Sequence, residues 1–186
     1  ECNQTAFDLI AGAAEWHTSG AILIGPPRSG KSKLGAHVAG QGQAILIDDA
    51  DGMADEALFH QWNRTREAGL APLLTATKLP GEWGVALADL QSRLGGAVLA
   101  HISEPDEAFL AALIRYHLGL LGGSIAEEAL DYAIPRLPRT HAMAEWFAVE
   151  ANAMALAQRR AITLPLVRDL LTRWEASAQL RLDDDL

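Results

Sequence analysis

A glycine-rich segment near the start of the chain has the residue types and spacing that bind phosphate groups. Residues 25–32 read Gly-Pro-Pro-Arg-Ser-Gly-Lys-Ser, which is the pattern G-x-x-x-x-G-K-S. Gly25 and Gly30 allow the backbone to curl, so that successive N–H groups point at phosphate oxygens. We expect the Lys31 ammonium to lie between the β- and γ-phosphates of a nucleotide and the Ser32 hydroxyl to hold Mg²⁺.

The flanking residues favour a phosphate-binding loop over an ordinary turn. The apolar run Ala21–Ile24 comes directly before the loop and predicts a buried strand, and residues 32–39 predict a helix that begins at the loop. The positive N-terminal end of that helix would face the same anion. A Gly/Pro turn between a strand and a helix is the alternative, and these two neighbours argue against it.

Two adjacent carboxylates follow the next apolar run. Residues 44–47 read Ala-Ile-Leu-Ile and lead directly into Asp48 and Asp49. A buried parallel strand delivers such acids to its carboxyl end, the edge of the sheet where ligands bind. We expect Asp48 to hold the Mg²⁺ shell and Asp49 to orient or deprotonate an attacking water. The alternative, a helix cap or a turn, is weaker behind an apolar run and a phosphate loop.

Hydroxyl groups and one arginine are the remaining candidates for chemistry. Thr75 and Thr77 close a third apolar run, residues 71–77, near where the γ-phosphate would lie. Packing of a β-branched residue in a strand explains each threonine equally well when it is taken singly. Arg93 lies in a predicted helix, residues 85–94, and the pattern alone favours a solvated helix residue.

The elements that must position these residues alternate between strands and helices only in the first half of the chain. Four apolar runs, at residues 21–24, 44–49, 71–77 and 97–102, are separated by helical patterns, which predicts an α/β domain with a parallel sheet. From Pro105 onward every apolar repeat is helical, and Ser124–Glu127 has the form of a capping box that opens a helix. We therefore predict an α/β domain, residues 1–104, and a small helical domain, residues 105–186.

Bulk properties exclude several classes of protein. The chain has 186 residues and a formal net charge of −9, which argues against a broad binding surface for DNA or RNA. Its lone Cys2 suits a reducing compartment. No apolar run approaches the roughly 20 residues of a membrane span, and no secretory pattern opens the chain. We therefore expect a cytoplasmic protein that does not enter membranes.

The order of these motifs resembles the AAA+ ATPases: phosphate loop, Asp-Asp strand, Thr-ended strand, Arg-bearing helix and helical lid. Four segments are similar to the replication initiator DnaA, namely Ile45-Leu-Ile-Asp-Asp-Ala, Leu73-Leu-Thr-Ala-Thr-Lys-Leu-Pro80, Leu90-Gln-Ser-Arg-Leu94 and Asn3-x-x-Ala6. The segment Trp83-Gly-Val-Ala-Leu-Ala-Asp-Leu resembles Hda, the family of DnaA-related regulators, in its α-proteobacterial form. The resemblance implies the AAA+ fold, a parallel-sheet P-loop core followed by a helical lid.

The same resemblance implies roles for individual residues. Asn3 would lie by the adenine, Thr77 would be the first sensor, and Arg93 would be an arginine finger that enters a neighbour's ATP site. Met143 stands where many relatives carry a phosphate-contacting arginine, and Arg139 lies about one helical turn away. The nucleotide phosphates would be bound by the whole loop, which comprises Gly25, Pro26, Pro27, Arg28, Ser29, Gly30, Lys31 and Ser32.

The implied activity is regulation of replication initiation. The chain would bind ATP or ADP with Mg²⁺ and present Arg93 to ATP on the DnaA initiator, with weak ATPase activity of its own. The resemblance leaves open the polymerase sliding clamp and a second copy of the chain as further partners. Two other interpretations remain at this point: a self-contained P-loop ATPase or kinase, and a DnaA-like initiator fragment or helicase loader.

One departure from the AAA+ pattern bears on the fold. The family usually has another strand and helix between the positions of Lys31 and Asp48, and here there is room for little more than one helix. We therefore expect either a sheet that lacks one edge strand or a segment that is absent from the sequence.

Overall fold

The computed structural model describes residues 3–12, 16 and 19–184, with side chains described as far as residue 177. Two compact units divide the chain, Glu1–Glu104 and Pro105–Leu186. The first unit contains α1 (Gln4–Ala11), β1 (Ala21–Ile24), α3 (Lys31–Ala39), β2 (Ala44–Ile47), η1 (Ala50–Gly52), α4 (Asp55–Glu67), β3 (Ala71–Ala76), η2 (Pro80–Glu82), α5 (Ala88–Gly96) and β4 (Val98–His101). The second contains α6 (Glu107–Leu120), α7 (Glu127–Ala133), η3 (Ile134–Arg136), α8 (His141–Gln158) and α9 (Leu164–Asp184).

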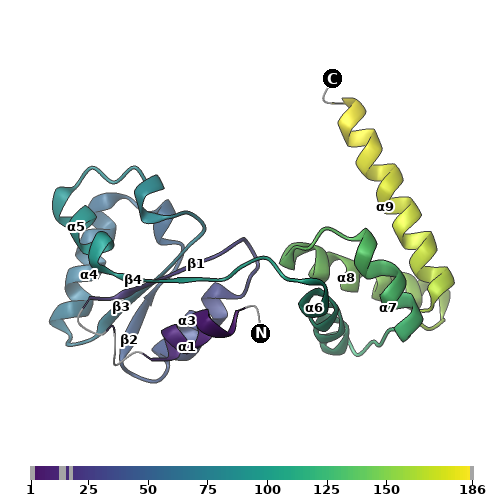
Figure 1. Ribbon diagram of the computed structural model, residues 1–186, viewed down its shortest axis with the longest axis horizontal. Helices are drawn as coiled ribbons and strands as arrows, with labels where there is room; N and C mark the ends of the chain where they lie inside the picture. Colours follow the sequence, from purple (N-terminus) through teal and green to yellow (C-terminus); the bar gives the residue numbers. More distant parts are fainter. Residues whose placement is uncertain (1–2, 13–15, 17–18, 185–186) are drawn as a thin grey trace. The chain divides into compact units, whose positions relative to one another are not determined.

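A four-stranded parallel sheet with the order β2-β3-β1-β4 organises the first unit. Figure 1 shows α1 and α3 on one side of the strands and α4 and α5 on the other. Every residue of the central strands β1 and β3 is buried, because helices cover both faces. The continuous apolar sequences of these two strands are therefore what a doubly covered sheet requires.

Alternate residues of each strand supply two separate apolar clusters. In β1, Ala21 and Leu23 face the α1 and α3 side, whereas Ile22 and Ile24 face the α4 and α5 side. Trp16 fills the first cluster and Trp62 of α4 fills the second. The two layers fix all four strands in one register, so the carboxyl ends of β1, β2 and β3 meet at one edge.

The sheet ends at β2. Only residues 40–43 separate α3 from β2, which leaves no room for another strand and helix. Ile45 in the middle of β2 is 38% exposed, whereas Leu73 and Leu74 of the neighbouring strand are fully buried. The sheet of this chain therefore has four strands with β2 at one edge, and both explanations of the short connection stay predictions.

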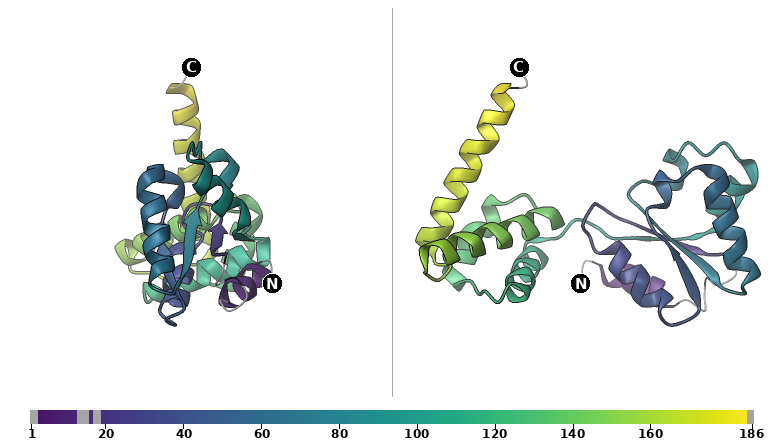
Figure 2. Two further views of the ribbon diagram at one scale, coloured as in Figure 1. Left: turned by 90° about the vertical axis from the view of Figure 1, so that its left-hand side faces the viewer. Right: turned by 180° about the vertical axis from the view of Figure 1, so that it is seen from behind.

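The second unit is a helical domain with its own apolar core. Leu110 and Ile114 of α6, Phe147 of α8 and Leu166 of α9 are completely buried together. Figure 2 shows α9 extending well beyond the other three helices of this unit. Side chains cap two of the helices: Asp106 Oδ1 accepts from Phe109 N at 2.7 Å, and Thr140 Oγ1 accepts from Met143 N at 3.1 Å.

Some sequence-based boundaries are wrong. The helix predicted to open with a Ser124 capping box begins at Glu127, with no side-chain cap. Ile125 instead forms a bridge with Ile162, and this contact holds the preceding residues extended. No helix among the described residues is long and apolar enough to cross a membrane.

Candidate nucleotide-binding site

The loop between β1 and α3 has the backbone that its glycines predict. Gly30 has a φ of +88°, in the left-handed region that glycine adopts without strain. A Cβ on Gly25 would lie 2.9 Å from both the Cβ and the carbonyl oxygen of Ile102, so no larger residue fits there without a shift. Arg28 also has a positive φ, +63°. The loop is therefore a tightly wound segment at the carboxyl end of β1.

Lys31 points back into this loop. Its side chain is only 6% exposed, and its Nζ donates to the carbonyl oxygens of Gly25 at 2.8 Å and Pro26 at 2.9 Å. Burial lowers the pKa of the Lys31 ammonium, and the carboxylates of Asp49, Asp51 and Asp48 oppose that shift. The ammonium is thus held inside the loop, where a bound phosphate could replace the two carbonyl contacts.

The residues predicted to hold Mg²⁺ lie together. Ser32 Oγ donates to Asp48 Oδ1 at 2.9 Å, although the two residues are 16 positions apart. Thr75 Oγ1 donates to the same carboxylate oxygen at 2.5 Å. Hydroxyl and carboxylate oxygens are the ligands that Mg²⁺ takes, together with phosphate oxygens and water. Within the described residues no group of three or more acidic, histidine or cysteine side chains could form a complete metal cage.

Ser29 supports the same interpretation of the loop. Its Oγ is buried and has no hydrogen-bond partner. Buried hydroxyl groups are almost always satisfied in folded proteins, because a lost hydrogen bond costs about 1–3 kcal/mol. A phosphate oxygen in the loop would supply the missing acceptor. The buried Ser29 hydroxyl, the Gly25 cradle and the Ser32–Asp48 contact together fit a nucleotide with Mg²⁺.

Asp49 follows Asp48 in a different backbone conformation. Its φ is +50°, and its backbone N–H donates to Thr75 Oγ1 at 2.9 Å. The side chain is exposed. Thr75 is therefore the hydroxyl that ties the two aspartates to β3, a role that β-branched packing in a strand would not have predicted.

Thr77 is bound by an aspartate that the sequence analysis did not single out. Asp51 Oδ2 accepts from Thr77 Oγ1 at 2.5 Å, from Thr77 N at 2.8 Å and from Lys78 N at 3.2 Å. Burial raises the pKa of Asp51, but the hydrogen bonds from Thr77 and Lys78 outweigh it and hold that pKa below its usual range. Thr77 thus lies just past the end of β3 with its hydroxyl oriented by Asp51.

We expect Asp51→Asn to loosen this connection between the β2 and β3 loops. Asparagine has the same size as aspartate but lacks the negative charge that strengthens the three hydrogen bonds to Oδ2. The free energy of unfolding should therefore fall by about 1–2 kcal/mol at neutral pH. Because the folded chain lowers the pKa of Asp51, its contribution is present above the unfolded pKa of about 3.9 and is lost as pH falls through the folded value. Urea unfolding of both proteins from pH 7 to pH 3 measures this difference. A gap that stays constant down to pH 3 would contradict the assignment.

Arg93 is engaged by α4 of its own unit. Its guanidinium carbon lies 4.5 Å from the centroid of the Phe59 ring, and its Nη1 donates to Asn63 Oδ1. The side chain is half-buried rather than fully solvated. Arg93 is therefore less solvated than the pattern alone favours, because Phe59 and Asn63 lie one helical turn apart on α4 and both contact it.

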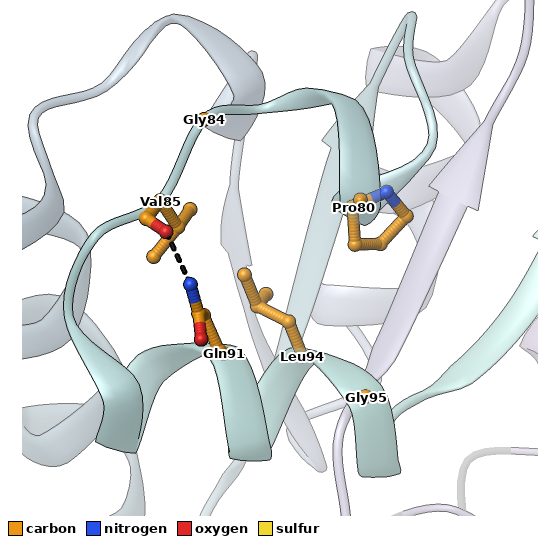
Figure 3. A pocket seen from close by; sticks show the side chains of 7 residues that line it. Pro80, Gly84, Val85, Gln91, Leu94 and Gly95 are labelled. Atoms are coloured by element: carbon orange, nitrogen blue, oxygen red, sulfur yellow. Dashed lines mark hydrogen bonds between the residues drawn. The ribbon is translucent and has the colours of Figure 1, made fainter.

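A cavity of about 320 Å³ lies between the η2 loop and α5 (Figure 3). Gln91 Nε2 donates to the carbonyl oxygen of Val85 at 2.5 Å on one side of it. No charged side chain lines the cavity. Its lining residues are Pro80, Gly81, Gly84, Val85, Gln91, Leu94 and Gly95.

The remaining candidates lie farther along the chain. Asn3 Oδ1 accepts from Ser103 N at 2.9 Å, so the start of α1 is attached to the segment that follows β4. Met143 is in the first turn of α8 and packs against the helical core. Arg139 is exposed, two residues before α8. Roles for Asn3, Met143 and Arg139 in binding a nucleotide stay predictions.

Solved structures of similar shape identify the architecture. Domain III of the replication initiation protein DnaA from Thermotoga maritima superposes with a TM-score of 0.77 and 16% identity, over 92% of this chain and 91% of that one. The RuvB Holliday junction branch migration motor of the same organism gives 0.66 at 18% identity, over 89% and 66% of the two chains. The fold is that of the AAA+ ATPases. The predicted fold class, a P-loop core with a parallel sheet followed by a helical domain, is confirmed.

Sequence comparison adds a distant relationship to DnaA. The chain is 26% identical over 132 residues to the chromosomal replication initiator protein DnaA of Aliarcobacter butzleri and, over the same length, to that of Magnetococcus marinus. The match covers 68% of this chain and 30% of each relative. No family model matches the sequence. A further AAA+ neighbour is AMPPCP-bound DnaA from Aquifex aeolicus, with a TM-score of 0.64 and 17% identity over 83% of this chain and 62% of that one.

Proposed function

We propose that this chain is a nucleotide-binding AAA+ regulator of chromosomal replication initiation, of the Hda type. It would bind ADP or ATP with Mg²⁺ and stimulate ATP hydrolysis on DnaA by presenting Arg93 in trans. The observation that carries the proposal is the convergence of Lys31, Ser32 and Asp48 at the carboxyl ends of β1 and β2. The residue types there are the ones that hold a nucleotide phosphate and its metal ion.

Residues 1–104 would be the nucleotide-binding core and residues 105–186 the lid. The loop from Gly25 through Pro26, Pro27 and Arg28 to Ser32 would cradle the phosphates, and Ser32 and Asp48 would hold Mg²⁺. The bound metal ion supplies charge neutralisation on the phosphate oxygens. Asp49 would orient the attacking water, and Thr77, held by Asp51, would contact it or the γ-phosphate. AMPPCP in the Aquifex aeolicus neighbour supports this assignment of ligand.

A role in trans is supported by what Arg93 contacts. Its partners are Phe59 and Asn63 of α4, and the phosphate loop of its own chain is not among them. These contacts would hold the guanidinium in one orientation, in which it could meet a phosphoryl group of another molecule. The partner would be DnaA, with the sliding clamp and a second copy of this chain as further partners, in the cytoplasm.

The experiment that tests this function is single-turnover hydrolysis of ATP preloaded on DnaA, with DNA-loaded clamp present. Adding the regulator should speed hydrolysis by about 10³-fold or more, which is the range of arginine fingers in other nucleotide hydrolases. Failure of the unaltered protein to stimulate would reject the regulator. Rapid turnover by this protein alone would indicate a self-contained ATPase, and salt-sensitive DNA affinity would indicate an initiator fragment or helicase loader.

We expect Met143→Arg to tighten ATP binding or to raise intrinsic hydrolysis severalfold. A guanidinium in the first turn of α8 would add a charge-assisted hydrogen bond to a phosphate oxygen. Isothermal titration with ATP and ADP, together with a turnover assay, measures both effects. Met154→Arg, on the same helix three turns away, is the matched control and should change neither quantity. If Met143→Arg changes neither the affinity nor the rate, then either α8 is aligned wrongly with the family pattern or Arg139 already contacts the phosphate.

A further inference from the structure

Two arginines of the helical unit share one tyrosine ring. The guanidinium carbon of Arg136 lies 3.8 Å from the centroid of the Tyr132 ring, and that of Arg168 lies 5.1 Å from the same centroid. Tyr132 belongs to α7, Arg136 to η3 and Arg168 to α9, so three separate elements meet at this ring. The two guanidinium carbons are no farther apart than the sum of these two distances.

No carboxylate neutralises this pair within the described part of the chain. Other arginines of the same unit do have acidic partners: Arg115 is 2.5 Å from Glu127, and Arg160 is 3.4 Å from Asp169. The chain carries 24 acidic and only 15 basic side chains other than histidine, so this pair is a local concentration of positive charge in an acidic chain. An anion that binds near both groups would relieve their mutual repulsion.

The pair is also held in place. Tyr132 packs against the buried core of the helical unit, and Arg136 Nη1 donates to the Tyr132 carbonyl oxygen at 2.7 Å. Contact with the ring face restrains both guanidinium groups. Each guanidinium has five N–H donors, and the hydrogen bond from Arg136 to the Tyr132 carbonyl oxygen uses one of them. Most donors of these two exposed side chains therefore remain available, and the ring contacts reduce the side-chain entropy that is lost on binding.

We propose that Arg136, Arg168 and Tyr132 form an anion site that binds a phosphate group, separate from the phosphate loop. Two guanidinium groups supply a charge of +2 and several donors, which match an oxyanion with three or more acceptor oxygens and a charge near −2. A single carboxylate offers two oxygens and one charge, so it would leave the second arginine unmatched. The phosphate would come either from a free phosphate compound or from a nucleic-acid backbone.

The test follows the side-chain Nε–Hε signals of the arginines in the ¹⁵N-labelled full chain by NMR. Inorganic pyrophosphate is titrated in one series and a short DNA duplex in another. The signals of Arg136 and Arg168 should shift together and saturate with one apparent Kd. Because these signals report on their own surroundings, pyrophosphate bound at the phosphate loop cannot produce the effect. Arg136→Gln and Arg168→Gln should each weaken binding about tenfold, the loss of a strong hydrogen-bonded contact.

Matched variants separate specific recognition from general attraction. Arg159→Gln removes an exposed cation of the same unit that has no aromatic neighbour among the described residues. The affinity of this variant for pyrophosphate should stay within about twofold of that of the unaltered protein. Arg136→Lys should also lose affinity, because a point charge cannot reproduce the guanidinium fork. A duplex that binds more tightly than pyrophosphate, with affinity falling steeply with salt, identifies a nucleic-acid backbone as the source. Binding of pyrophosphate alone identifies a free phosphate compound.

Three results would overturn the proposal. The first is the absence of saturable shifts at either arginine with both probes. The second is an equal shift of the Arg159 signal with the same apparent Kd, which means unspecific attraction. The third is tighter binding of a polyglutamate peptide than of either phosphate probe, which would replace the phosphate with a carboxylate-rich partner.

Discussion

Replacing Lys31 with alanine is expected to weaken ADP and ATP binding by at least about two orders of magnitude. The Lys31 ammonium is buried in the loop, and burial lowers its pKa, so a desolvated charge is already positioned for an anion. Losing such a contact to a phosphate oxygen typically costs about 2–5 kcal/mol. Equilibrium dialysis with labelled nucleotide measures the affinity. An unchanged ADP affinity would mean that residues 25–32 are not the phosphate site.

The variant must be separated from a folding defect. Lys31→Ala also removes the donors to the Gly25 and Pro26 carbonyl oxygens, so we expect the free energy of unfolding to fall by about 1–2 kcal/mol. Lys33→Ala, an exposed cation in the same helix, is the matched control and should keep both nucleotide affinity and stability. Circular dichroism and thermal unfolding of the three proteins show whether the loss of binding exceeds any loss of fold.

The second large effect is expected at Arg93. Arg93→Ala should leave ADP affinity unchanged and yet reduce stimulation of DnaA-bound ATP hydrolysis by about 10³-fold or more. The free energy of unfolding should fall by about 1 kcal/mol, because the contacts with Phe59 and Asn63 are lost. Arg93→Lys should rescue poorly, since an ammonium lacks the planar fork that matches phosphoryl oxygens. Single-turnover hydrolysis on DnaA gives the rate.

A control on the neighbouring helix makes this result specific. Arg64→Ala removes the same charge from an exposed position of α4 and should stimulate as the unaltered protein does. If Arg93→Ala stimulates equally well, Arg93 is not the finger and the cation that acts in trans lies elsewhere. If Arg93→Ala and Arg64→Ala lose stimulation equally, the loss results from the reduced positive charge and not from a specific contact of Arg93.

The fold and the phosphate loop could be predicted because their chemistry is local. Gly25, Gly30, Lys31 and Ser32 must stand at fixed spacing after a buried strand to surround a phosphate, so their types and order carry the information. The two halves of the sequence likewise differ in period, with short apolar runs before Glu104 and helical repeats after it. Both signals are read from neighbouring residues and need no knowledge of the sheet order.

The contacts that were missed join residues far apart in sequence. Asp51 meets Thr77 only because β2 lies beside β3 in one register, and no pattern around Asp51 reports that neighbour. Arg93 meets Asn63 only because α4 and α5 cover the same face of the sheet. The failed capping box at Ser124 has the same origin, since the bridge to Ile162 comes from a distant segment. Tertiary pairing decides these details, and local propensity does not.

The short connection before β2 has a consequence for colloidal behaviour. It makes β2 an edge strand, although its sequence, Ala-Ile-Leu-Ile, is as apolar as that of a central strand. The unpaired backbone N–H and C=O groups on its outer side can form hydrogen bonds with a strand of another molecule. Mutual repulsion between chains of net charge −9 opposes such stacking at neutral pH. That protection disappears near the isoelectric point of about 5.0. Light scattering should therefore rise as pH approaches 5, and Ile45→Lys should suppress the rise.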